Sequence, residues 1–405
     1  MGWLTAAQAL DALGVRPQTL YASVSRKRIR AKADPQDPRR SLYHEADVRR
    51  LARRRVGPRK VEEVAAGAIE WGDPVLPSAM STVAAGRLWY RGQDAALLAE
   101  SKTLEEVAAL LWGGDEVTRA PRSPPGDTSG FRESGSSTPL HRAFMSLAER
   151  ASLDPPSYGR SPSVLREEAR GVLLTLAESL LGSGGDVSAP LHLRLATAWQ
   201  RKGASKILQR TLVLLADHEL NASTFAARVA VSTGASLAAG VLAGLATLTG
   251  PLHGGAAAGV WELVETARSQ GAESAVRDRL GQGRPMAGFG HPLYPAGDPR
   301  AVSLLQSLVL PAEYVAVRDA VEHWVGERPN IDFALAAMTR THRLPKDAPL
   351  ILFALARCVG WLAHELEQVA TGHLIRPRAR YVGNALGTSL EAGSTRRSGA
   401  RPTAP

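Results

Sequence analysis

The chain carries histidines in glycine-rich segments and an aspartate close to a proline, residue types that can move protons at carbon. His253 lies between a Gly-Pro and a Gly-Gly pair, in a run of 33 residues, Val229 to Trp261, without Asp, Glu, Lys or Arg. A helix that begins near Ala256 would direct the positive end of its dipole at His253 and disfavour the imidazolium form. A neutral imidazole can donate a hydrogen bond to a carbonyl that is becoming an enolate. The other interpretation is a core histidine at a glycine-rich packing point.

Three further segments carry candidate functional side chains. His218 precedes an Asn-Ala-Ser-Thr sequence that can cap the following helix. His291 belongs to a Gly-Phe-Gly-His sequence, nine residues before Arg300. Asp332 follows a Pro-Asn-Ile sequence and should lie at the start of a helix. A carboxylate there is either an ordinary residue of a first helical turn or a base directed at a substrate.

In this order the segments resemble the citrate synthase family, over most of the chain after Lys60. No single motif decides the resemblance, but so many in the correct order are hard to obtain by chance. The resemblance implies an all-α fold: a large helical domain (61–254 and 346–390), a small helical domain (255–345) and a homodimer. The matching segments are Tyr90–Asp94, Thr103–Trp112, Ala216–Phe225, Thr249–Ala256, Ala287–Arg300, Arg328–Phe333, Ala356–His364 and Leu374–Arg378.

The resemblance also assigns chemistry to three residues. Removing a proton from the methyl group of a thioester needs a base close to a weak carbon acid and a donor at the developing oxyanion. By resemblance, Asp332 is that base and His253 is the donor. His291 would polarise the ketone of the second substrate, oxaloacetate. The acyl donor is a coenzyme A thioester, which is a substrate, and no cofactor or metal is implied.

Four more residues would bind the oxo acid. His218 stands where the family binds it, and arginine forks match the geometry of its carboxylates better than lysine does. The corresponding arginines are Arg300, Arg357 and Arg376. The resemblance implies that Arg376 reaches the site of the neighbouring subunit.

The chain departs from the family pattern beside His291. Family members of this bacterial type usually have Arg and Lys where this chain has Pro292 and Pro295. The second basic residue commonly helps to hold coenzyme A phosphates, so the departure puts the affinity for coenzyme A, or the identity of the acyl donor, in question. The segment between His291 and Asp332 is also shorter than usual. All catalytic residue types are retained, which favours an active site.

Composition and periodicity favour helices. Hydrophobic residues make up 44% of the chain but aromatic residues only 5%, so Ala, Leu and Val must build the core. Apolar residues recur at helical spacing. The uncharged run is long enough to span a bilayer, but its Ser, Thr, Gly and Pro residues favour a buried core helix and no membrane partner. The predicted helices are Ala95–Leu111, Leu165–Leu181, Lys206–Leu215, Phe225–Leu248 and Leu350–Gln368.

The first 60 residues differ from the rest in charge. They contain 15 Lys and Arg against 5 Asp and Glu, a net charge of +10, which equals the net charge of the whole chain, so the remainder sums to zero. Such a concentration indicates a polyanion-binding segment, and the other interpretation is a solvated domain or one that docks on its own enzyme domain.

The pattern of this segment resembles the helix-turn-helix of mercury-resistance-type regulators and phage excisionases. It predicts a Thr5-capped helix up to Gly14, a second helix from Val15 to Ser25, and a third that opens at Leu42 and ends in Arg53–Arg55. The second helix would enter the major groove of duplex DNA, and basic flanks would contact phosphates. The candidate contacts are Gln18, Thr19, Tyr21, Arg26, Lys27 and Arg28.

The remaining features set the context. Residues 113–139 should form a loop, and residues 391–405 a disordered tail. The single cysteine, Cys358, excludes an intrachain disulfide and fits a cytoplasmic protein without a signal peptide.

Three functions stay open: a synthase that condenses acetyl-CoA with oxaloacetate to citrate, a 2-methylcitrate synthase that uses propionyl-CoA, and a DNA-binding regulator whose synthase-like domain senses a ligand. Asp332 favours an enzyme, since a sensor needs no carbon-acid base.

Overall fold

The structure is a computed structural model, and it describes residues 3–13, 20, 24, 29–33, 41–48, 76–114, 138–182, 186–379 and 381–383. The chain forms two compact units, Met1–Val75 with Arg378–Pro405, and Leu76–Pro377. All residues proposed above for catalysis or substrate binding belong to the second unit.

The first unit contains a short helix and an antiparallel sheet of strand order β1-β3-β2. The elements are β1 (Trp3–Leu4), α1 (Ala6–Leu13), β2 (Ala31–Ala33) and β3 (Ser41–His44). The predicted cap of the first helix is confirmed: Thr5 Oγ1 accepts the Gln8 backbone N–H at 3.3 Å, and Gln8 Oε1 accepts the Thr5 backbone N–H at 2.9 Å. The small core consists of Ala9, Leu20, Ile29, Tyr43 and Val48.

The predicted third helix is wrong at its start. Leu42 and Tyr43 belong to β3 and pair with β2, and helical structure begins only at Glu45. Tyr43 is 2% exposed, and an aromatic residue in a ladder between two strands gains more from cross-strand packing than from one helical turn. Of the second predicted helix, Leu20 and Val24 are described, and both are helical. The proposed DNA contacts lie outside the described residues: Gln18, Thr19, Tyr21, Arg26, Lys27 and Arg28.

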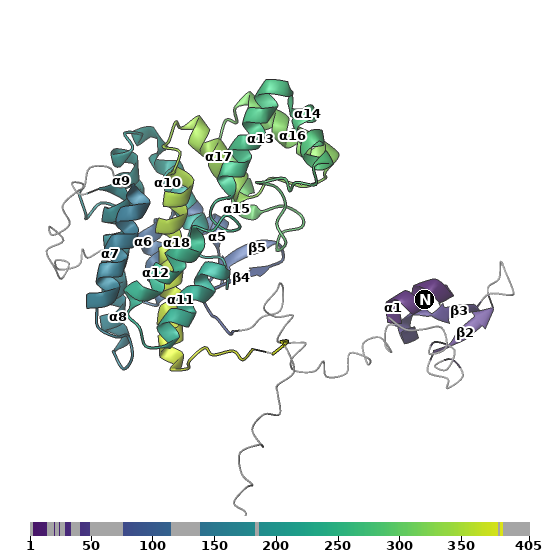
Figure 1. Ribbon diagram of the computed structural model, residues 1–405, viewed down its shortest axis with the longest axis horizontal. Coiled ribbons are helices and arrows are strands. Elements are labelled where there is room, and N and C mark those ends of the chain that lie inside the picture. Colours follow the sequence, from purple (N-terminus) through teal and green to yellow (C-terminus); the bar gives the residue numbers. More distant parts are fainter. Residues whose placement is uncertain are drawn as a thin grey trace, which may run out of the picture. The chain divides into compact units, whose positions relative to one another are not determined.

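The second unit is predominantly helical, in agreement with the expected all-α class, and its only sheet within the described residues is the small β4-β5-β6 meander. Helix α18 runs through the middle of the larger group of helices (Figure 1). The elements of this group are β4 (Ser81–Ala84), β5 (Arg87–Tyr90), β6 (Gln93–Asp94), α5 (Ala95–Ser101), α6 (Leu104–Trp112), α7 (Pro139–Leu153), α8 (Pro162–Leu181), α9 (Leu191–Ala198), the 3₁₀ turn η2 (Lys202–Ala204), α10 (Ser205–Leu215), α11 (Ala222–Ser232), α12 (Leu237–Leu248) and α18 (Ala348–Thr371).

Two of the predicted long helices are each divided into two. The segment from Ala95 breaks after Ser101 because Thr103 forms a capping box with Glu106 and starts a new helix. The segment from Phe225 breaks at Gly234, whose φ of +87° suits glycine, and Ser236 then caps α12. Alanine and leucine periodicity is therefore a good guide to helical content but does not mark these internal caps.

The uncharged run is divided between α11, α12 and the start of the next helix, and its inward faces join the core, whereas its turn at Pro251 and Leu252 is exposed. Among the described residues, Ala348–Thr371 alone is long and apolar enough to cross a membrane by length and composition, and 89% of its apolar window is buried inside the protein. This helix carries Arg357, His364 and Glu365, all fully or almost fully buried. The apolar side chains of this helix pack in the core of the protein.

A second group of helices gathers at one end of this unit (Figure 1). It has its own hydrophobic cluster, built mainly around Val260, Phe289, Val317 and Phe333. The helices are α13 (Ala256–Gln270), α14 (Ala272–Gly281), α16 (Ala312–Trp324) and α17 (Ile331–Thr341), while α15 (Pro299–Leu305) contributes Ala301 and Leu304 to the cluster of the larger group. The proposed domain limits at 254/255 and 345/346 stay a prediction.

Helix α17 contributes side chains to both hydrophobic clusters of this unit. Phe333, Ala336 and Ala337 belong to the cluster of the smaller group, and Ala334 and Leu335 to that of the larger group. Helical periodicity places these two sets on different faces. The first turn of α17 is consequently held from two sides.

Candidate active site

His253 occupies the turn between α12 and α13, and α13 begins at Ala256 as the sequence predicted. Burial and the positive charge of Arg357 lower the pKa of His253 from 6.5 to about 4. The sequence predicted this direction from the helix dipole alone. The imidazole is thus neutral at pH 7 and can act as a hydrogen-bond donor.

A serine determines which nitrogen of His253 carries the proton. Ser223 Oγ lies 2.8 Å from His253 Nε2, accepts the indole N–H of Trp361 at 3.1 Å, and lies 2.7 Å from Asn221 Oδ1. The hydroxyl has one proton, so it donates either to the Asn221 oxygen or to the imidazole. If it donates to Nε2, the proton of the neutral ring is on Nδ1.

His291 is held by its own loop. Its Nδ1 accepts the backbone N–H of Leu293 at 3.2 Å, and the Tyr294 N–H donates to the His291 carbonyl at 2.9 Å. Burial and Arg300 lower the pKa of His291 from 6.5 to about 4, although the nearby Asp298 acts in the opposite direction. Because Nδ1 accepts a hydrogen bond, the proton of the neutral ring is on Nε2. His291 is therefore a neutral donor.

His218 lies next to His291, with ring centroids 5.2 Å apart and perpendicular planes. Its Nε2 is 2.9 Å from the Tyr294 hydroxyl. The pKa of His218 lies well below 6.5 because the ring is buried and because Arg300, Arg357 and the neighbouring imidazoles disfavour a further positive charge.

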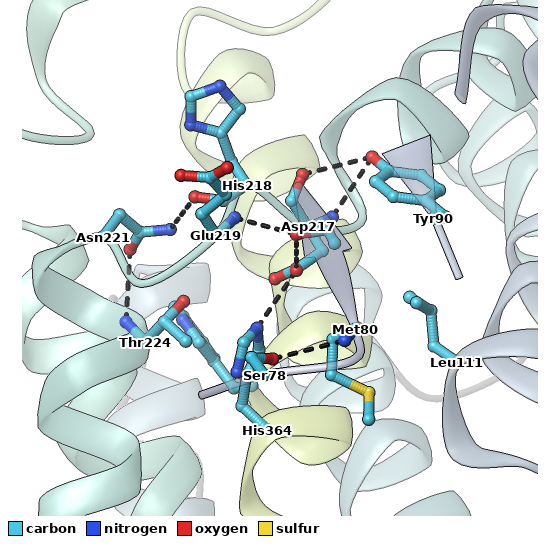
Figure 2. Close-up of polar contacts among 12 residues, drawn as sticks. Ser78, Met80, Tyr90, Leu111, Asp217, His218, Glu219, Asn221, Thr224 and His364 are labelled. Carbon is cyan, nitrogen blue, oxygen red and sulfur yellow. Dashed lines mark hydrogen bonds and ion pairs between the residues drawn. The ribbon is translucent and has the colours of Figure 1, made fainter. Parts of the chain in front are cut away.

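Buried polar contacts fix the backbone on both sides of His218. Asp217 meets His364 of α18 at 3.1 Å, with both side chains fully buried, and it also accepts a hydrogen bond from Ser81. Glu219 has φ of +52° and accepts hydrogen bonds from Thr82 and Val83 of β4. Figure 2 shows the His218 ring directed away from the side on which Asp217 meets His364. Strand β4 and α18 together hold the segment from which His218 projects.

The two arginines differ in how much of each guanidinium is free. Arg300 is 3% exposed, and its Nε and Nη2 donate to both carboxylate oxygens of Asp298 at 3.0 and 2.8 Å. Arg357 is 2% exposed, and its Nε donates to the Leu215 carbonyl at 3.0 Å. The paired edge of Arg300 is thus occupied, whereas the terminal nitrogens of Arg357 can form a two-pronged contact with a carboxylate.

Asp332 is the second residue of α17, as predicted, and is half-buried. Burial raises the pKa of Asp332 from 3.8 to about 6. The negative charge of Asp298 also raises this pKa, whereas the positive charge of Arg300 lowers it. In the part of the chain that the structure describes, its carboxylate accepts no hydrogen bond. A carboxylate without hydrogen bonds and with this pKa is ionised at pH 7 and a stronger base than usual.

Arg376 differs from the other proposed residues. It is exposed on the segment that follows α18, and the backbone of its neighbour Ile375 is tied to Ser232 at 3.1 Å. Arg376 forms no hydrogen bond or ion pair with the described residues. The arginine charges that lower the pKa values of the three buried histidines are those of Arg300 and Arg357. The structure thus assembles the other six proposed residues within one chain, and Arg376 stays apart from them.

Sequence reasoning missed four residues of this site: Ser223, Tyr294, Asp298 and Asn330. Asp298 and Asn330 had a signal, because Asp before proline and Asn two residues before an acidic first turn are helix caps, and both do cap helices here. Ser223 and Tyr294 had none, since only the fold brings them to His253 and His218.

Comparison with known proteins identifies related chains. Residues 186–378 match the family described as citrate synthase, C-terminal domain. Citrate synthase 2 of Bacillus subtilis is 40% identical over 185 residues, 43% of this chain and 50% of that protein, so the match spans about half of that relative. A Mycobacterium tuberculosis protein, provisionally named citrate synthase 2, is 31% identical over 74% of this chain and 87% of its own length.

Two further comparisons cover most of the second unit. A 2-methylcitrate synthase of Shewanella oneidensis is 29% identical over 77% of this chain and 93% of its own length. The crystal structure of citrate synthase from Thermoplasma acidophilum, in a ternary complex with carboxymethyl coenzyme A and oxaloacetate, superposes with a TM-score of 0.64 at 25% identity. It covers 79% of this chain and 96% of that one. These likenesses are to enzymes of the citrate synthase type.

Proposed function

The chain belongs to the citrate synthase family, and we propose that it condenses an acyl-coenzyme A thioester with oxaloacetate, acetyl-CoA giving citrate and free coenzyme A. The observation that carries this proposal is one cluster of three neutral imidazoles and two arginines beside a carboxylate with a pKa of about 6. This combination is what carbon-acid chemistry at neutral pH requires.

The first step forms the nucleophile. Asp332 takes a proton from the methyl carbon next to the thioester carbonyl, while His253 donates a hydrogen bond to the carbonyl oxygen as charge develops there. For this, the His253 proton must be on Nδ1, which requires Ser223 to turn its hydroxyl proton from Asn221 Oδ1 to His253 Nε2. A neutral donor suits the role, because it stabilises the developing oxyanion without requiring a buried positive charge in the resting site.

The second step forms the carbon–carbon bond. The enolate carbon attacks the ketone carbon of oxaloacetate, and the ketone oxygen takes the proton of His291 Nε2–H. The imidazole regains a proton as Asp332 gives up the one that it took from the methyl group, so the step is neutral in protons. His218 and Arg357 can hold the carboxylates, and Arg300 can contribute through Nη1, which has no hydrogen-bond partner among the described residues. Water then cleaves the resulting thioester to the tricarboxylate and free coenzyme A.

The acyl group is the main open choice. Relatives of this chain carry the names citrate synthase and 2-methylcitrate synthase, and Pro292 and Pro295 replace the usual basic residues beside His291. An assay of thiol release with oxaloacetate and either acetyl-CoA or propionyl-CoA tests the function and the choice together. No thiol release with either donor, from protein that is folded, would contradict the proposal.

We further propose a homodimer in which Arg376 completes the site of the partner. Its support is the exposed position of Arg376 and its lack of a bonded partner among the described residues of its own chain. A third oxo-acid arginine supplied in trans would make activity depend on assembly.

A second candidate function concerns residues 1–60. Their net charge of +10, against zero for the rest of the chain, favours a polyanion partner such as duplex DNA. The chain would then combine synthase chemistry with regulation. Binding to labelled duplex DNA at several salt concentrations tests this, because each phosphate that the protein neutralises adds about 0.9 to the slope of log affinity against log salt. No binding at low salt would leave these residues without a DNA role.

A further inference from the structure

A short antiparallel contact joins the loop of His291 to the start of the helix that carries Asp332. The Asn330 backbone N–H donates to the Gly288 carbonyl at 2.8 Å, and the Gly290 N–H donates to the Arg328 carbonyl at 2.9 Å. Gly288 has φ of +84°, and a β-carbon there would lie 2.5 Å from Val260. The loop of His291 therefore packs too closely on α13 for any residue but glycine at position 288.

The side chain of Asn330 adds a second link across the same contact. Its Nδ2 donates to the Gly290 carbonyl at 3.0 Å, and its Oδ1 accepts the Asp332 backbone N–H at 3.0 Å. Gly290 directly precedes His291. One carboxamide thus bonds the residue before the ketone-polarising imidazole and the backbone of the proposed base.

Asp298 reinforces this arrangement from the other end of the loop. Its Oδ2 accepts the Ile331 N–H at 3.1 Å, while the same carboxylate caps α15 and pairs with Arg300. Two consecutive N–H groups at the start of α17 are therefore satisfied by side chains, one from the loop of His291 and one from Asn330. Such groups otherwise need water or other partners.

We propose that Asn330 is a positioning residue that sets the separation between the His291 imidazole and the Asp332 carboxylate through its bond to the Gly290 carbonyl. The proposal rests on the synthase function proposed above. The competing explanation is that Asn330 is only the cap of α17. The two can be distinguished because Asn, Asp and Ser cap helices about equally well, whereas an ionised aspartate has no donor for the Gly290 carbonyl and the shorter serine cannot cap and reach it at once.

The test compares Asn330→Ser, Asn330→Asp and Asn330→Ala with the wild-type protein. A serine hydroxyl that caps α17 does not reach the Gly290 carbonyl, and an aspartate places an acceptor against it. Since a misplacement of about 1 Å can cost on the order of 100-fold in rate, we expect all three variants to lose at least about tenfold in kcat. The KM for oxaloacetate should stay within about twofold, because the residues that hold its carboxylates, His218, Arg300 and Arg357, are untouched. The Ser and Asp variants should melt near the wild-type temperature.

Thr138→Ala is the matched control, because Thr138 caps α7 through the His141 N–H at 3.2 Å and has no contact with the site. It should lose stability as Asn330→Ala does, with kcat unchanged. If the Ser and Asp variants keep wild-type kcat while Asn330→Ala loses activity together with stability, Asn330 is a cap only and the proposal is wrong.

Hydrogen exchange makes the test independent of turnover. Peptides covering 286–298 should exchange faster in the Ser and Asp variants, and peptides covering 331–341 should not change, because the cap is kept. Unchanged exchange in 286–298 would show that the backbone contact alone holds the loop, and would overturn the proposal. If the wild-type protein releases no thiol, the proposed function is contradicted. Hydrogen exchange in 286–298 then still shows whether Asn330 positions the loop of His291.

Discussion

Ionisation of Asp332 should control the acidic side of the pH–rate profile. With a pKa of about 6, about nine-tenths of the carboxyl groups are ionised at pH 7 and about one-tenth at pH 5, which predicts a tenfold fall in kcat/KM between them. An ordinary aspartate would remain almost fully ionised over this interval. His253 and His291, with pKa values of about 4, stay neutral above pH 5 and do not add to the fall.

The same pKa has a consequence for stability. Below about pH 3 the carboxyl is protonated in the folded and the unfolded chain alike, and stability does not depend on its ionisation. Between about pH 3 and 6 the unfolded chain releases its proton first, so the folded protein loses stability as the pH rises. The difference between 3.8 and about 6 corresponds to at most about 3 kcal/mol, fully developed above pH 6. Asp332→Asn should therefore be more stable than wild type at pH 7 and differ little from it near pH 4.

Two measurements check this reasoning. Thiol release between pH 5 and 8 gives the acidic limb, and urea unfolding at pH 4 and 7 gives the stability of wild type and Asp332→Asn. The variant should lose about 10²–10⁴-fold in rate. Asp319→Asn, an exposed carboxylate of α16 paired with Arg318, should alter neither result. A flat wild-type profile down to pH 5, or a variant less stable at pH 7, would refute the raised pKa.

Three further outcomes follow from the structure. Glu365 is fully buried with both oxygens unpaired among the described residues, and burial raises its pKa well above 4.5. Because the wild-type protein loses stability as the pH rises toward this pKa, Glu365→Gln should stabilise the protein by a margin that grows from pH 5 to 8 in thermal melts. If Arg376 acts in trans, mixing inactive Arg376→Ala and His253→Ala subunits should restore thiol release in dimers shown to exchange, and no recovery would place Arg376 outside the partner's site. Deleting residues 1–60 should keep condensation within a few-fold and remove DNA binding, whereas a deletion that instead damages activity or stability would indicate a docking domain.

Local sequence signals were sufficient wherever a structure depends on neighbours in the chain. The Thr5 cap, the helix start at Ala256 and the place of Asp332 in a first helical turn follow from residues within one or two turns. They were predicted correctly. The start of the predicted helix at Leu42 was not, because cross-strand pairing with residues about ten positions earlier in the chain decides that segment.

The residue types of the site could be predicted from the sequence, but their protonation and orientation could not. The pKa of Asp332 depends on burial and on Arg300 and Asp298, which lie more than 30 residues earlier in the chain. The tautomer of His253 depends on Ser223 of another helix, and the setting of His218 depends on β4 and α18. Short-range patterns determine which groups are present and where helices start. Desolvation and long-range hydrogen bonds exist only once segments distant in the chain are packed together, and in this protein they decide which groups are neutral, which are charged and which nitrogen can donate.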